Sequence, residues 1–127
     1  MRVYMKEYNA EHPKFYADVR KRRAERALAT KKIVLKRYGK GYKLQCCWRG
    51  CLVADVDMLS IDHIDDKGAE HRERLTKGKY RTGGGLNFYG WLLRNNFPEG
   101  FQTLCHNHQW KKEILRRKEK RMNVKKL

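Results

Sequence analysis

The sequence has little proline, few acidic residues and no long apolar run. Each of these shortages excludes some classes of protein. No stretch approaches the ~20 apolar residues that a membrane-spanning helix requires, so we expect no membrane partner. Residues 1–14, MRVYMKEYNAEHPK, lack the apolar segment of a signal peptide, which predicts an intracellular protein that is not secreted. No glycine- or serine-rich linker divides the 127 residues, a length typical of a single domain.

The shortage of acid leaves a large positive charge. The chain has 31 lysines and arginines against 14 aspartates and glutamates, for a net charge of +17. Basic residues concentrate in RKRRAER (20–26), KKIVLKR (31–37) and KKEILRRKEKR (111–121), while acid gathers in the middle, over 54–73. This surplus favours a polyanionic partner and makes nucleic acid the leading candidate. A basic ribosomal-type protein has a similar composition, so charge alone does not separate these classes.

With only two prolines, little in the sequence interrupts a helix. His12-Pro13 is a favourable helix start, and no breaker follows before the glycines at 39 and 41. The sequence therefore predicts a basic helical N-terminal arm over 1–37 and a domain over 38–127. Within the domain, the pattern predicts a strand ending at 62–63, a helix over 86–96, a strand over 101–104 and a basic helix over 105–121. This set is α+β, and its apolar core is small enough to need a further cross-link.

Four cysteines in a reducing compartment favour metal binding over disulfides. Cys47 and Cys51 form one close pair, and Cys105 and His108 form another far along the chain. Three thiolates and one imidazole are a donor set that structural Zn²⁺ prefers, so we predict a Cys₃His zinc site. Cys46 is a close alternative to Cys47, because both spacings to Cys51 exceed the usual gap of a zinc knuckle. Buried, inert thiols are the competing interpretation.

An aspartate and a histidine stand side by side at the end of the first predicted strand, in MLSIDHIDDKG (58–68). Hydrolysis of a phosphodiester needs an activated water and a cation on the phosphate oxygens. His63 is a natural general base near neutral pH, and Asp62 offers a hard oxygen ligand to Mg²⁺ or Mn²⁺. For an isolated Asp-His pair, a hydrogen-bonded histidine at a strand end is the competing interpretation.

The order of these motifs resembles a known family. CWRGC (47–51), SIDHID (60–65) and TLCHNHQ (103–109) are similar to the Cys-x-x-Cys, Asp-His-Ile and Leu-Cys-x-x-Cys-Asn motifs of the zinc-containing HNH endonucleases, which are common in phages. The resemblance covers about residues 38–115. It implies a small zinc-containing domain of the ββα-metal (HNH) fold. It also implies metal-dependent hydrolysis of DNA, by nicking or double-strand cleavage.

The resemblance further implies that Asp62 binds the catalytic Mg²⁺ or Mn²⁺ and that His63 deprotonates the attacking water. The third family position, normally Asn or His, is Gln109, whose carbonyl is the same type of ligand on a longer side chain. His108 replaces the last zinc cysteine. Alternatively, His108 binds the catalytic metal and zinc keeps three cysteines.

Three basic residues are candidate nucleic-acid contacts, with solvated surface positions as the competing interpretation: Arg72, Lys111 and Lys112. The glutamine at position 109 keeps a second function open, a zinc-stabilised nucleic-acid-binding protein with an impaired or lost active site. A structural RNA-binding role comes third.

Overall fold

The structure, a computed structural model, describes residues 3–65, 67, 70 and 85–125. Its elements in chain order are α1 (Val3–Glu11), α2 (Pro13–Arg37), β1 (Leu59–His63), α4 (Gly85–Arg94), β2 (Phe101–Cys105) and α5 (His106–Lys125). Single 3-10 turns at Lys40–Tyr42 and Val56–Met58 lie between α2 and β1. The α+β prediction and the elements expected within the domain are therefore confirmed.

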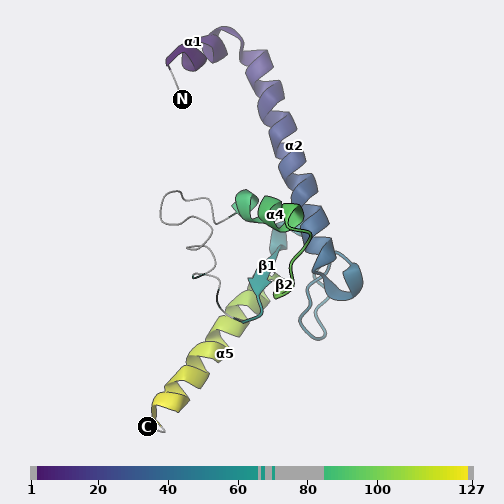
Figure 1. The fold of residues 1–127 in the computed structure, drawn as a ribbon, viewed down its shortest axis with the longest axis vertical. Coiled ribbons are helices and arrows are strands. Elements are labelled where there is room, and N and C mark those ends of the chain that lie inside the picture. Colours follow the sequence, from purple (N-terminus) through teal and green to yellow (C-terminus); the bar gives the residue numbers. More distant parts are fainter. Residues whose placement is uncertain (1–2, 66, 68–69, 71–84, 126–127) are drawn as a thin grey trace.

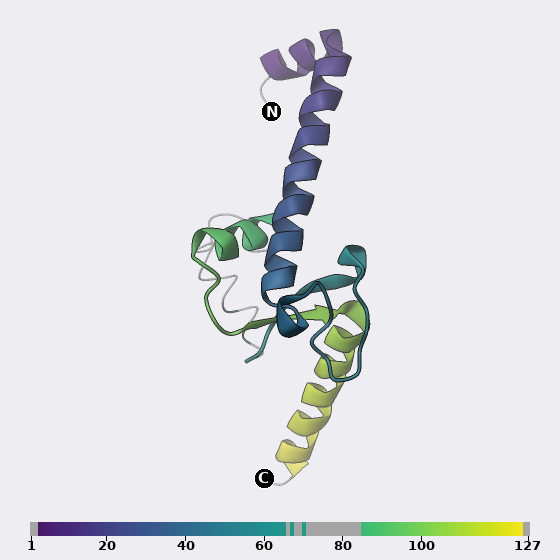
Figure 2. The ribbon, with the colours of Figure 1, turned by 90° about the vertical axis from the view of Figure 1, so that its right-hand side faces the viewer.

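Helix α2 begins at Pro13, as predicted from the His12-Pro13 pair. Proline suits this first position because its missing N–H has no intrahelical partner there. Figures 1 and 2 show α2 and α5 projecting from the sheet in opposite directions, with the first half of α2 and the last half of α5 away from the sheet. Only the last turns of α2 enter the core, where Val34 and Leu35 are fully buried. The helix over the predicted arm thus contributes to the core of the domain.

Strands β1 and β2 form a two-stranded antiparallel sheet, and their register decides which residues share a face. The register pairs Ser60 with Leu104, Asp62 with Gln102 and His63 with Phe101. Because side chains alternate along a strand, Ser60 and Asp62 point to one face, while His63 points to the other.

Different helices pack on the two faces of the sheet. Helix α5 lies on the face of Asp62, since Lys112 of α5 contacts the Asp62 carboxylate. Helices α2 and α4 lie on the opposite face. There Thr103 Oγ1 donates to the Leu35 carbonyl at 2.7 Å, and the His63 ring stacks on Phe88 at 5.5 Å.

The hydrophobic core lies between the sheet, α4 and the end of α2. Its buried apolar members are Val34, Leu35, Cys46, Cys51, Leu59, Phe88, Tyr89, Leu92, Leu104 and Cys105. Three of these ten residues are cysteines, so the aliphatic and aromatic part is small, as the sequence predicts. Among the described residues, no helix combines the length and apolarity needed to cross a membrane.

Candidate metal centre and the end of strand β1

Two of the cysteines come from one loop that precedes β1. Cys46 N–H donates to the Val53 carbonyl at 2.9 Å and Cys51 N–H donates to the Trp48 carbonyl at 3.0 Å, which folds the loop back on itself. Gly50 has a φ of 81°, a left-handed conformation that glycine adopts without steric cost. These contacts turn Cys46 and Cys51 toward the same side.

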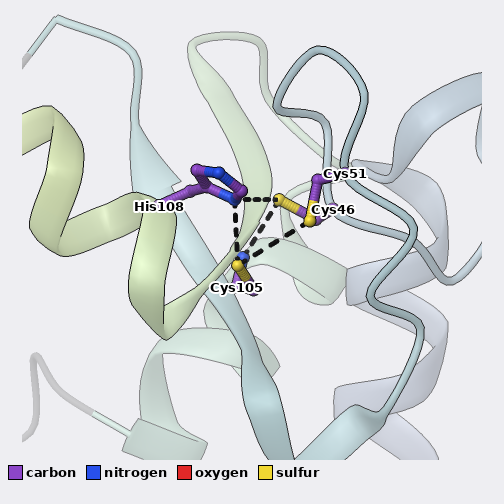
Figure 3. Close-up of side chains that lie close together, drawn as sticks. All are labelled: Cys46, Cys51, Cys105 and His108. Carbon is purple, nitrogen blue, oxygen red and sulfur yellow. Dashed lines mark hydrogen bonds between the residues drawn. The ribbon is translucent and has the colours of Figure 1, made fainter.

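The other two candidate ligands come from the junction of β2 and α5. Cys105 is the last residue of β2 and His108 lies in the first turn of α5. Its Nδ1 is 3.1 Å from Cys105 Sγ and 3.7 Å from Cys46 Sγ. Figure 3 shows the four side chains pointing toward one another from the loop, the strand end and the helix.

The four side chains Cys46, Cys51, Cys105 and His108 could hold a metal ion. Their ligand atoms all lie within 4.8 Å of one another. A tetrahedral Zn²⁺ with Zn–S bonds of about 2.3 Å separates its sulfurs by roughly 3.8 Å. The Cys51 and Cys105 sulfurs are 3.9 Å apart. Donor set and spacing are therefore compatible with structural zinc.

The structure places Cys46 in this cluster, so the preference for Cys47 is corrected in favour of its neighbour. The Cys47 N–H donates to the Thr103 carbonyl at 2.8 Å, which docks this residue beside β2. Its thiol then points away from the cluster and donates to the Tyr38 carbonyl at 3.1 Å. Cys46 Sγ instead lies 3.7 Å from His108 Nδ1, so the two neighbouring thiols have different partners.

The surroundings of the thiols shift their acidity in opposite directions. Burial raises the pKa of the Cys46 thiol to about 11. The backbone hydrogen bond from Val53 lowers the pKa of Cys51 below its ordinary value. Metal binding requires thiolates, so a metal that binds here displaces protons from the thiols. Trp48, which sequence reasoning did not assign to the site, stacks on the His108 ring with centroids 4.8 Å apart and orients it.

At the end of β1, the Asp62 carboxylate is held by two donors. Lys112 Nζ lies 2.7 Å from Asp62 Oδ2, and the same oxygen accepts from Gln102 Nε2 at 2.9 Å. The Asp62 and Lys112 side chains are 15% and 19% exposed, so this ion pair is partly shielded from water. Gln102 was missed by sequence reasoning, although it is the cross-strand partner of Asp62 once the two predicted strands are paired antiparallel.

His63 lies at the same strand end, with its ring on the other face of the sheet. The ring stacks on Phe88 and meets Phe101 edge-on, with centroids 5.5 Å and 4.8 Å away. Its backbone carbonyl accepts a hydrogen bond of 2.6 Å from Lys112 Nζ. Asp62 and His63 are thus adjacent in the chain, while their side chains have different neighbours.

The remaining predicted site residues have separate positions. Gln109 faces β1, where its Nε2 donates to the Ser60 hydroxyl, two residues before Asp62. His108 faces the cysteines, so its alternative assignment to the catalytic metal is not the arrangement seen. Lys111 is exposed on α5, and Arg72 lies outside the described residues.

Comparison of the chain with family models, curated proteins and solved structures found no match. The functional argument therefore depends on the site itself.

Proposed function

We propose that this chain is a metal-dependent endonuclease of the HNH type that hydrolyses phosphodiester bonds of DNA. The observation that carries the proposal is the Asp62–His63 pair at the end of β1, beside a Cys₃His cluster that anchors the start of α5. The order β1, β2, α5 and the antiparallel pairing of the strands are consistent with the resemblance in the motifs. The net charge of +17 suits a polyanionic substrate.

In this proposal the Cys₃His cluster binds Zn²⁺ and has a structural role. All four ligands come from protein side chains, which leaves no open position for a substrate. Closed tetrahedral sites of this kind stabilise folds, whereas catalytic zinc sites keep one position open. Zinc here would join the loop before β1 to the β2–α5 junction.

The catalytic cation would be a hard ion such as Mg²⁺ or Mn²⁺ held at Asp62. The donor set fits, because the Asp62 carboxylate and the His63 carbonyl already surround a cation, the Lys112 ammonium. Gln109 lies on the same face of β1, contacting Ser60, and its amide oxygen is a further candidate ligand. Such an ion, when bound, would neutralise charge on the scissile phosphate.

His63 would act as the general base that takes a proton from the attacking water. A neutral imidazole can accept that proton near neutral pH. In this structure the ring packs against Phe88 and Phe101 on the sheet face opposite Asp62, so this role requires the ring to turn toward the Asp62 carboxylate when substrate binds.

The experiment is conversion of supercoiled plasmid to nicked or linear DNA by zinc-loaded protein, with and without Mg²⁺ or Mn²⁺. His63→Ala should lower the rate by about 10²–10⁴-fold, the usual contribution of a general base. His106→Ala is the matched control, because His106 is an exposed histidine at the start of α5. Loss of cleavage in both variants, or in neither, would count against the assignment of His63.

A second candidate is a zinc-stabilised nucleic-acid-binding protein without catalysis. It is favoured by two contacts: Lys112 already neutralises Asp62, and Gln109 replaces the usual Asn or His and contacts Ser60. The plasmid assay separates the two functions. Tight binding of DNA or RNA with no cleavage of plasmid, branched DNA or RNA under any metal supports this candidate.

A further inference from the structure

The Lys112 ammonium lies among oxygen atoms at the end of β1. Its Nζ is 2.7 Å from Asp62 Oδ2, 2.6 Å from the His63 carbonyl and 3.4 Å from the Ile64 carbonyl. The sequence predicts Lys112 as a contact to phosphate. In this structure its charge is instead directed inward, while its neighbour Lys111 is exposed.

The atoms that hold this ammonium are the kind that hold a divalent cation. A carboxylate oxygen and backbone carbonyls are the hard ligands that Mg²⁺ and Mn²⁺ prefer. One oxygen, Asp62 Oδ2, cannot keep its 2.7 Å contact with an ammonium and also bind a metal ion without strong repulsion between the two cations. A divalent ion that binds Oδ2 and the His63 carbonyl, the two oxygens closest to the ammonium, therefore displaces Lys112.

Two features allow this displacement without collapse of the site. Gln102 Nε2 also donates to Asp62 Oδ2, so the carboxylate keeps one orienting contact when the ammonium leaves. The Lys112 side chain is 19% exposed, which gives its long, flexible stem access to solvent.

We propose that Lys112 is an exchangeable internal cation: it occupies Asp62 until a divalent ion binds, and it is then released to contact a phosphate of the nucleic acid. This proposal rests on the proposed cation site at Asp62. The exchange replaces one positive charge by two at the carboxylate and returns the ammonium to the surface. Metal and polyanion then favour each other's binding, and the coupling is reciprocal.

The first test measures Mn²⁺ binding to zinc-loaded, full-length protein by loss of the free-ion electron paramagnetic resonance signal. Lys112→Met should bind Mn²⁺ about tenfold more tightly or better, because the wild type binds only through its minor, ammonium-free population. Lys111→Met removes the same charge from the adjacent position and should keep the wild-type affinity. Lys112→Gln is measured in the same way and serves if the methionine variant does not fold.

The second test measures the salt dependence of DNA binding with and without Mn²⁺, in a His63→Ala background that prevents cleavage. One additional phosphate contact steepens the slope of log K against log salt by about 0.9. We expect Mn²⁺ to produce this change when Lys112 is present and not in Lys112→Met. Lys111→Met should still respond to Mn²⁺, which separates the exchange from a general loss of charge.

Equal Mn²⁺ affinity in the wild type and both Lys112 variants would overturn the proposal, as would a metal-dependent slope that persists without Lys112. These outcomes are independent of cleavage. A protein that exchanges Lys112 for Mn²⁺ but never cuts plasmid supports this inference while the endonuclease proposal fails. Cleavage of plasmid without any gain of Mn²⁺ affinity in the Lys112 variants supports the endonuclease proposal and refutes this inference.

Discussion

Two adjacent cysteines provide a direct test of the metal cluster. Cys46→Ser removes a sulfur that lies 3.7 Å from the His108 imidazole, whereas Cys47→Ser changes a thiol that contacts the Tyr38 carbonyl. The substitutions are chemically identical and differ by one position in the chain. A difference in zinc content between the variants therefore reports which thiol belongs to the cluster.

The two substitutions should change the free energy of unfolding by very different amounts. Structural zinc contributes about 10–16 kcal/mol in small zinc-binding peptides, which equals or exceeds the net stability of about 5–15 kcal/mol of a typical domain. Three of the ten buried apolar residues in the described part of the chain are the cluster cysteines, so a lost ligand removes a large share of this core. Cys46→Ser should thus abolish stoichiometric zinc and cooperative unfolding. Cys47→Ser keeps a donor for the Tyr38 carbonyl and should change stability by about 1 kcal/mol or less.

The assay combines zinc content, thermal unfolding and tryptophan fluorescence, with EDTA-treated wild type as the reference for metal loss. Trp48 stacks on His108, so its emission reports the cluster directly. Retention of zinc in Cys46→Ser with its loss in Cys47→Ser would refute the geometry. A wild type that unfolds at the same temperature before and after EDTA would refute the stabilising role of the metal.

Two further predictions concern the fold and α5. Thr103→Val should cost about 1–3 kcal/mol in denaturant unfolding, since it leaves the Leu35 carbonyl without its 2.7 Å donor, whereas Thr103→Ser keeps that hydroxyl and should cost less. Hydrogen bonds from Arg116 and Arg117 lower the pKa of Glu113 to about 2. Its contribution to stability is therefore present above the unfolded pKa of ~4.3 and lost as the pH falls through about 2. A carboxyl NMR titration of Glu113 checks this, and Arg116→Gln with Arg117→Gln should return the midpoint to about 4.3.

The elements around the site could be predicted because their signals are local. Residues 59–63 have the pattern of a short strand, and Pro13 is a favourable first residue for a helix. The choice between Cys46 and Cys47 is different. It depends on the hydrogen bond from Cys47 N–H to Thr103, a contact between distant parts of the chain. Spacing to Cys51 carries no information about that contact, so the sequence alone could not decide between the two thiols.

The position of Lys112 also depends on a contact between distant parts of the chain. Its partner Asp62 lies 50 residues earlier, and only the docking of α5 on the sheet brings the two together. That docking starts at the metal cluster, because Cys105 ends β2 and His108 lies in the first turn of α5. Further along the same helix, Gln109 contacts Ser60 and Lys112 contacts Asp62.

The candidate cluster and the end of β1 are therefore connected through α5. An ion bound at Cys105 and His108, as we propose, would hold the start of the helix that carries Lys112 to Asp62. A change in the cluster should consequently be detected at Asp62 even where no atom is shared. In our proposal, the cysteines would therefore stabilise the domain and also help to position the Lys112 ammonium at the Asp62 carboxylate.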